Sequence, residues 1–287
     1  MTPDTMPKDI YNMLVTKEMP MEEEERERII QEFGDNCMQF LREAMGPEQV
    51  RKGRLRLSSV GKPDRQIYND YHGVEREKLQ GPTHIKFLYG HLTEAMLLAL
   101  VKLSGHKVED EQKSCRVAGV NGSMDCTIDG HLVDIKSASS YGFKKFKEGR
   151  LPWDDPFGYI GQIKAYAHSE QNNNVGWLAM DKQNGTLCWL GYDLNNLAAE
   201  LEPLLGYDIE ARVMELKKLV EGNTPPLCYD EVPDGKSGNM KLSSGCSYCP
   251  YKHQCWPDLR TFLYSTGSKY LTKVDNTPRV VELVKGF

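Results

Sequence analysis

The dipeptide Asp129-Gly130 restricts the fold of this chain more than any other feature of the sequence. It separates two runs of strand-forming residues, 123–128 and 131–137. Asp-Gly between two such runs is typical of a two-residue β-hairpin turn, because both turn residues need a positive φ angle. A sheet that contains this hairpin is therefore expected at the centre of the fold.

The remaining secondary structure is predicted from the spacing of apolar residues. Residues 84–104 carry them at helical intervals and Gly105 follows, so a helix is expected there. The other expected helices are 21–45, with Gly34-Asp35 as a candidate break, 64–71, 157–168, 194–204 and 209–221. The other expected strands are 106–117 and, on either side of a second hairpin turn at Asn184-Gly185, 175–182 and 186–192. This order predicts an α/β fold with a mixed central sheet flanked by helices.

A chain of 287 residues is longer than one average domain and shorter than two. We expect a helical N-terminal region (1–55), a core with its following helices (56–222) and a cysteine-rich segment with a C-terminal tail (223–287). The longest apolar stretch, 95–101, is far shorter than the roughly 18 residues that span a bilayer. The first residues show no signal-peptide pattern, so a cytoplasmic location without membrane contact is expected.

Charge and cysteine content point in different directions. The formal net charge is −5, from 36 basic and 41 acidic residues, which argues against a protein that coats nucleic acid. Eight cysteines are many for a chain that is not exported, and in a reducing compartment they indicate buried thiols or metal ligands rather than disulfides.

Three charged residues are expected to converge on the predicted hairpin. Asp134 and Lys136 are two apart on one strand, so they project from the same face, and the turn folds Asp125 back beside them. Carboxylates suit Mg²⁺ or Mn²⁺, and a neighbouring lysine can orient water or balance developing charge. A surface hairpin with an ordinary salt bridge is the alternative, and it would be favoured if these three residues stood alone.

The flanking helices supply further candidates. Glu94 follows Gly90 by four residues on the helix before the hairpin, and His91 lies on roughly the same face. Gln162 and Tyr166 are one turn apart on the helix after it. The alternative is that Tyr166 packs in the core with Gln162 at its rim.

In this order, Gly90-x3-Glu94, Asp125, Asp134-Ile135-Lys136 and Gln162-x3-Tyr166 resemble the RecB-type branch of the PD-(D/E)XK nuclease superfamily. The resemblance covers roughly residues 56–192 and implies a restriction-endonuclease-like core. It implies that Asp125, Asp134 and the backbone carbonyl of Ile135 bind the catalytic metal, and that Lys136 is the catalytic lysine. Glu94 matches the acid of the first motif, whereas His91 does not fill that position. Gln162 and Tyr166 match the motif that positions the lysine and the DNA strand.

The sequence Cys246-x2-Cys249-x5-Cys255 predicts a metal site near the C-terminus. With His253 it could bind Zn²⁺, but the tail resembles that of iron–sulfur RecB-family nucleases, including CRISPR spacer-acquisition exonucleases, in which four cysteines hold a 4Fe–4S cluster as a structural staple. The chain departs from that pattern because residues 62–68 contain no cysteine. Cys228 is the best candidate for the fourth ligand, with Asp64 and Cys37 as alternatives. The remaining cysteines (Cys115, Cys126, Cys188) lie in predicted strands and are expected to be buried thiols.

Positive charge that could bind DNA is concentrated in residues 139–150, directly after the catalytic strand. The candidate DNA contacts there are Lys144, Lys145, Lys147, Arg150 and Tyr141. The alternative is a solvated amphipathic turn with its aromatic residues, Phe143 and Phe146 among them, in the core. A second wall could come from Arg51, Lys52, Arg54, Arg56 and Arg65, for which a solvated face is an equal alternative.

The expected function is that of a Mg²⁺- or Mn²⁺-dependent DNA exonuclease acting on single-stranded or duplex ends. The compact design also resembles nucleases of tailed bacteriophages, which suggests a role in recombination, repair or phage genome processing, with a recombination protein as partner. The alternatives are a non-catalytic DNA-end-binding subunit and a structure- or site-specific endonuclease. Cleavage polarity, strand preference and oligomeric state are not predicted.

Overall fold

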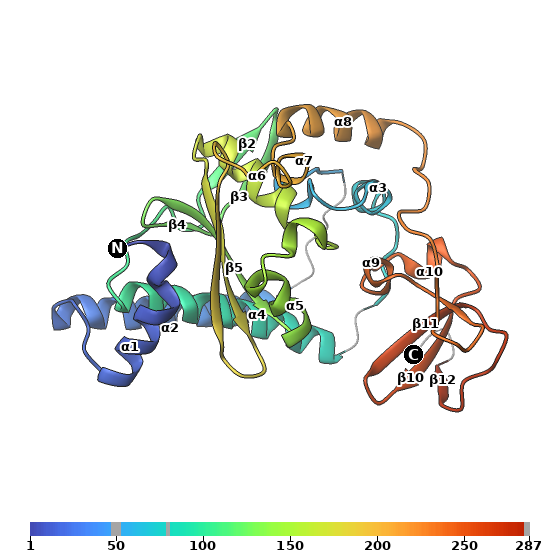
Figure 1. Cartoon of the computed structure of the whole chain (residues 1–287), viewed down its shortest axis with the longest axis horizontal. Coiled ribbons are helices and arrows are strands. Elements are labelled where there is room, and N and C mark those ends of the chain that lie inside the picture. Colours follow the sequence, from blue (N-terminus) through green and yellow to red (C-terminus); the bar gives the residue numbers. More distant parts are fainter. Residues whose placement is uncertain (47–52, 79–80, 284–287) are drawn as a thin grey trace. The chain divides into compact units, whose positions relative to one another are not determined.

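The computed structural model describes residues 1–46, 53–78 and 81–283, which form two compact units (Figure 1). The described part of the first unit comprises residues 1–46, 55–61 and 81–214. The second comprises residues 53–54, 62–78 and 215–283. The segment 62–78 therefore packs with the C-terminal residues rather than with its neighbours in sequence.

A mixed five-stranded sheet lies at the centre of the first unit, as predicted. Its order is β1 (Val108–Glu109), β4 (Cys126–Ile128), β5 (His131–Ala138), β6 (Asn174–Asp181) and β7 (Leu187–Asp193). Strands β5 and β6 are parallel and the other neighbours are antiparallel. A separate hairpin is formed by β2 (Ser114–Val117) and β3 (Val120–Ser123).

The turn that joins β4 and β5 has the conformation that its sequence predicts. Asp129 and Gly130 adopt φ angles of 48° and 81°, and Ile128 pairs with His131 across the turn. This register alternates the side chains of β5 between the two faces, with Val133 and Ile135 on one and Asp134 and Lys136 on the other.

Helices cover both faces of the sheet. On one face, α1 (Met6–Thr16) and α4 (Gly81–Leu103) bury Ile10, Leu97 and Val101 against Val133 and Ile135. On the other lie α5 (Ser140–Lys147) and α6 (Tyr159–Glu170). Short 3₁₀ turns occur at η1 (Pro3–Thr5), η2 (Leu57–Ser59) and η3 (Leu151–Trp153), and α7 (Glu202–Leu205) and α8 (Ile209–Glu221) follow the sheet.

Three local predictions were wrong. Helix α2 (Glu23–Ala44) is not broken at Gly34-Asp35, since Gln31 bonds to Asp35 one turn ahead and the helix packs along α4. The strand expected over 106–117 is interrupted because Asp110 and Gln112 adopt positive φ angles. The helix expected over 194–204 is mostly turns, because the Asp193 carboxylate accepts a hydrogen bond from the backbone of Asn195.

The second unit combines α3 (Asp64–His72) with the cysteine segment and a small antiparallel sheet, which was not predicted. The sheet has the order β12 (Val281–Leu283), β10 (Arg260–Tyr264), β11 (Gly267–Lys273), β9 (Met240–Lys241) and β8 (Val232–Pro233). The cysteines lie around α9 (Ser244–Ser247) and α10 (Lys252–Cys255). The Tyr251 hydroxyl donates to Asp70 at 2.6 Å, which ties this segment to α3. No described helix combines the length and apolarity needed to cross a membrane.

Close backbone contact between glycines sets the position of α6. A Cβ atom at Gly161 would lie 2.4 Å from the Cα of Gly61, and one at Gly61 would lie 2.4 Å from the carbonyl oxygen of Gly158. Any side chain at these positions would therefore push α6 away from the segment that precedes α3.

We expect Gly161→Ala to lower the free energy of unfolding by about 1–3 kcal/mol, the usual range for overpacking. Gly34→Ala is the matched control, because nothing lies within 4 Å of its Cβ position in α2 and the added methyl group favours helix by roughly 0.5–1 kcal/mol. Urea unfolding of both variants measures the difference. Equal midpoints for the two variants would contradict the close contact.

Candidate active site

The site is built around a buried ion pair on β5. The ammonium of Lys136 lies 2.6 Å from Oδ1 of Asp134, which is 1% exposed. Their partners on β6 are Trp177 and Ala179, and the small Ala179 stands opposite the long lysine side chain. The pair thus lies on the sheet face that α6 covers.

Asp125 is fixed against the same strand by the β4–β5 hairpin. Its Oδ2 accepts a hydrogen bond from the backbone N–H of Ile135 at 3.0 Å. The carboxylate of Asp125 is therefore held beside the backbone that links Asp134 to Lys136, as the hairpin predicted.

Glu94 reaches the site from α4 and is held by Gln112, a residue that the sequence did not single out. The side-chain amide of Gln112 donates to Oε1 of Glu94 at 3.1 Å, and its backbone N–H donates to the carbonyl of Asp125 at 2.9 Å. Ser123 donates to the backbone carbonyl of Gln112 at 3.0 Å. Gln112 has a φ angle of 51°, so this loop holds a left-handed conformation where it links two of the acids.

Helix α6 presents three polar side chains to the ion pair. The Gln162 amide lies 3.3 Å from both Oδ1 of Asp134 and the hydroxyl of Tyr166. Tyr159 was missed by the sequence analysis: its ring centroid lies 5.0 Å from the Lys136 ammonium. Its spacing to Gln162 and Tyr166, three and seven residues, is the signal that could have found it.

Acidic side chains outnumber basic ones in the site. Burial raises the pKa of Glu94 to about 8, the charge of Asp125 adds to this effect and Lys136 opposes it. Burial likewise raises the pKa of Asp134 to about 7, with Lys136 opposing and Asp125 adding. Burial disfavours the charge on Lys136, but Asp134 and Asp125 hold its pKa above the usual value. One ammonium therefore faces three carboxylates.

This donor set fits a divalent cation of the Mg²⁺ or Mn²⁺ type. Its ligands would be hard carboxylate oxygens, and Oδ2 of Asp134 is buried without a hydrogen-bond partner. Among the described residues, however, no group of three or more histidine, cysteine, aspartate or glutamate side chains has an arrangement that could hold a metal ion. At the active site, Lys136 contacts the Asp134 oxygen that a cation would otherwise share.

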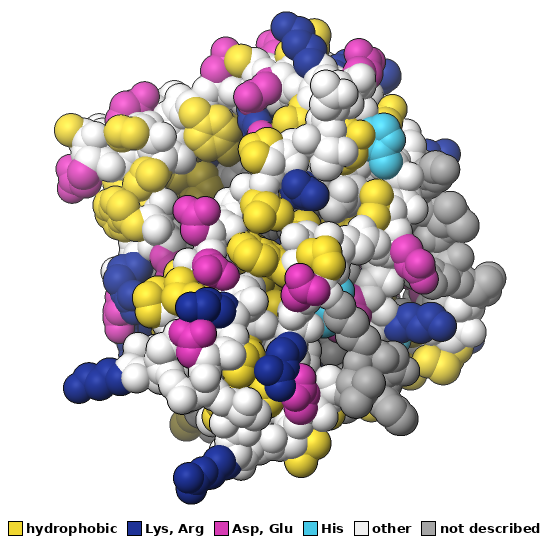
Figure 2. Space-filling view, turned by 90° about the vertical axis from the view of Figure 1, so that its right-hand side faces the viewer, with side chains coloured by type: hydrophobic (Ala, Val, Ile, Leu, Met, Phe, Trp, Pro, Cys, Tyr) yellow, Lys and Arg dark blue, Asp and Glu magenta, His cyan; other side chains and the backbone are white. Residues whose placement is uncertain are grey.

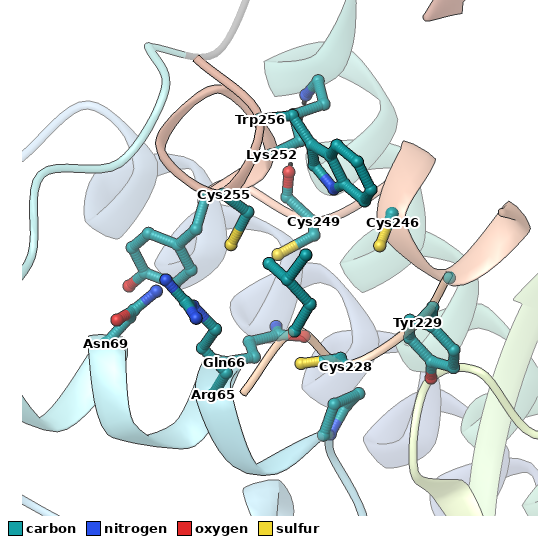
Figure 3. Close-up of a pocket in the computed structure, with 14 residues that line it drawn as sticks. Arg65, Gln66, Asn69, Cys228, Tyr229, Cys246, Cys249, Lys252, Cys255 and Trp256 are labelled. Carbon is teal, nitrogen blue, oxygen red and sulfur yellow. Dashed lines mark hydrogen bonds between the residues drawn. The ribbon is translucent and has the colours of Figure 1, made fainter. Parts of the chain in front are cut away.

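The four predicted cluster cysteines line one pocket in the second unit (Figure 3). They are Cys228, Cys246, Cys249 and Cys255. Burial raises the pKa of Cys249 to about 11, and the other three thiols add to this shift. Asp64 is not among the residues that line the pocket, and Cys37 lies on α2 in the first unit. None of the eight cysteines, all of them described, forms a disulfide.

Cys228 is positioned by the start of α3. Burial raises its pKa, while hydrogen bonds from the backbone of Gln66 and Arg65 oppose that shift. The thiol of Cys228 therefore lies beside the N-terminal end of α3.

The candidate DNA contacts differ in their exposure and in the ion pairs that they form. Lys144, Lys147 and Tyr141 are exposed on α5, whereas Phe143 and Phe146 are buried. Lys145 is only 8% exposed and its ammonium lies 2.8 Å from Oδ1 of Asp154. Arg150 pairs with Glu148 at 2.7 Å.

Arg65 belongs to the cysteine pocket, and its guanidinium donates to the carbonyl of Pro225 at 2.9 Å. Arg51 and Lys52 lie outside the described residues. The face shown in Figure 2 mixes basic and acidic side chains, and its described residues form no continuous basic patch. On this face, a polyanion such as DNA would therefore be bound by individual basic side chains rather than by a continuous basic patch.

Comparison with known proteins gives weak structural similarities only. No family model and no curated protein matches the chain. The solved structures that resemble it include the alkaline exonuclease LHK-Exo from Laribacter hongkongensis, with 16% identity and a TM-score of 0.35 over 60% of this chain and 91% of that one. SSO0001 has 12% identity and a TM-score of 0.41, with 79% and 96% covered. A phage-related exonuclease from Haemophilus somnus 129PT has 13% identity and a TM-score of 0.34, with 58% and 93% covered. The functional assignment therefore depends on the site itself.

The pH dependence of stability tests the charge imbalance. In Glu94→Gln the side chain cannot ionise, whereas wild-type Glu94, whose pKa is raised above that of an unfolded chain, loses its stabilising protonated form as the pH passes through about 8. In EDTA, the variant should therefore gain stability relative to wild type between pH 5 and pH 9, measured by urea unfolding. Glu24→Gln at the exposed start of α2 is the control. A difference that does not change with pH would contradict the raised pKa.

Proposed function

We propose that the chain is a Mg²⁺- or Mn²⁺-dependent DNA exonuclease of the RecB-type PD-(D/E)XK class. The observation that supports this most strongly is the buried Asp134–Lys136 pair, with Asp125 bonded to the intervening backbone and Gln162 bonded to Asp134. Each of these residues was selected from the sequence, and they come from three separate segments. Their convergence matches the motif order of that class.

The acids would form the cation site. Asp125, Asp134 and the carbonyl of Ile135 would hold the ion, with Glu94 beside them. When bound, a divalent cation would lower the pKa of its water and stabilise charge on the phosphate. Burial and the neighbouring charge of Asp125 raise the pKa values of Glu94 and Asp134, and a bound cation would lower them.

Lys136 would act on the reacting groups. Asp134 and Asp125 keep its ammonium protonated, so it can donate hydrogen bonds to the attacking water and to the phosphate oxygen that gains charge. Gln162 holds the carboxylate of Asp134, and the ring of Tyr159 limits where the ammonium can move. The exposed Lys144 and Lys147 on the following helix would contact the phosphates of the strand.

This activity suits the processing of DNA ends in recombination, repair or phage genome metabolism, with a recombination protein as partner. A non-catalytic end-binding subunit and a structure- or site-specific endonuclease are the competing assignments. The assay below separates them, because only an exonuclease requires a free end and releases nucleotides from it.

We also propose that the cysteine pocket holds a 4Fe–4S cluster that joins residues 228–255 into one structural unit beside α3. Four thiols face one pocket, and the buried Nε of Arg65, which lines it, has no hydrogen-bond partner. This Nε–H is a free donor beside the four thiols, which fits an anionic occupant such as a thiolate-bound cluster. A Zn²⁺ site is the alternative.

Lys136→Ala should reduce kcat at least about 100-fold on end-labelled linear DNA with Mg²⁺, a loss typical of removing a group that stabilises transition-state charge. Lys107→Ala is the matched control, because Lys107 is an exposed lysine next to the edge strand β1, where it pairs with Glu109. Circular dichroism checks that both variants fold.

A covalently closed circle should resist wild-type enzyme. Cleavage of the circle would support an endonuclease, and DNA binding without any cleavage would support the end-binding subunit.

Protein purified without oxygen should be brown and contain about four iron atoms per chain, since four cysteines surround the pocket. Cys249→Ser should lose the iron and unfold at a lower temperature, because the cluster stabilises only the folded state. Cys188→Ser, on β7 in the other unit, should retain iron. Colourless protein containing zinc would identify the alternative metal, and protein free of both metals would exclude a metal site.

A further inference from the structure

The connection between α5 and α6 carries two exposed aromatic rings that the proposed mechanism does not use. Trp153 is 59% exposed and Phe157 is 43% exposed. A single exposed apolar residue is ordinary on a protein surface. Phe157 is informative because hydrogen bonds hold the backbone around it and because its ring packs on Tyr159.

The connection is held by buried and capped polar groups. The ammonium of Lys145 lies 2.8 Å from Oδ1 of Asp154 and 3.2 Å from its carbonyl oxygen. The two oxygens of Asp155 accept hydrogen bonds from the backbone of Gly158 and Ile160, at 2.9 and 2.8 Å. Hydrogen bonds therefore fix the backbone on either side of Phe157, which lowers the conformational cost of presenting its ring to a ligand.

Phe157 is linked to Lys136 through the ring of Tyr159. Its ring centroid lies 5.6 Å from that of Tyr159, with the planes inclined by 31°. Tyr159 in turn contacts the Lys136 ammonium at 5.0 Å. One face of Phe157 is thus supported from behind, and the exposed part of the ring lies two contacts from the lysine that would meet the phosphate.

We propose that Phe157, supported by Tyr159, stacks on an unpaired nucleobase of the strand whose phosphate is cleaved. This inference rests on the proposed nuclease function and deepens it. Every base offers a π-face, so such a platform accepts any sequence but requires a base that has left the duplex stack. The substrate class that follows is a single-stranded or frayed DNA end rather than a fully paired one.

The chemistry near the ring also favours a nucleotide. An apolar protein partner docked on Phe157 would engage the ring alone and make no use of the Lys136 ammonium two contacts away. A nucleotide places its base on the ring and its phosphate towards the lysine, so both halves of the ligand find a suitable partner.

The first test uses binding in EDTA, which needs no cleavage. Single-stranded oligonucleotides carry the fluorescent base 2-aminopurine at one position from the end, and stacking on an aromatic ring quenches its emission. Wild-type protein should quench strongly at one position near the end. Phe157→Trp should retain the quenching, whereas Phe157→Leu should lose it and bind about fivefold more weakly or worse, the lower limit for one stacked base. Leu263→Ala, a residue of β10 that is 47% exposed, is the control.

The second test measures hydrolysis with Mg²⁺. Phe157→Leu should raise KM for a single-stranded end at least about fivefold, and Phe157→Trp should restore it. If wild type cleaves DNA while Phe157→Leu matches it in both KM and quenching, the stacking proposal is wrong although the nuclease function stands. If wild type neither binds nor cleaves any DNA end, the proposed function fails and the stacking proposal fails with it.

Discussion

The buried ion pair between Asp134 and Lys136 is the interaction on which the rest of the site depends. Two charges on one buried strand are costly to desolvate, and they are tolerated because each is the other's partner and Gln162 adds a hydrogen bond. Asp125 and Glu94 then add negative charge that Lys136 alone does not balance. The proposed cation would supply the positive charge that this site lacks.

Local sequence patterns predicted the scaffold because they act over short distances. The turn at Asp129-Gly130 sets the register of β4 and β5, and that register alone places Asp125 beside Asp134 and Lys136. The candidate active-site residues on α4 and α6 came from the resemblance to nuclease motifs, and helical spacing showed only which of them share a face. The fold class therefore followed from local rules, whereas the candidate site also needed the resemblance.

The parts that sequence reasoning missed depend on contacts between distant segments. Gln112 matters only because its loop adopts a left-handed turn and reaches back to Glu94 across eighteen residues. The sequence suggests that Lys145 binds DNA, but its ammonium already forms an ion pair with Asp154. The sequence favoured Cys228 as the fourth cluster ligand only because it lies close to the other three cysteines along the chain. In the structure, hydrogen bonds from the backbone of Arg65 and Gln66, at the start of α3, hold its thiol.

The central claim is that the acids around Lys136 form a divalent cation site, and anomalous X-ray scattering from a crystal soaked in Mn²⁺ tests it most directly. The account predicts one strong peak bounded by the carboxylates of Asp125 and Asp134, with Lys136 moved off the Asp134 oxygen that it now contacts. A soaked crystal with no peak there, and with the Asp134–Lys136 pair unchanged at 2.6 Å, would contradict it.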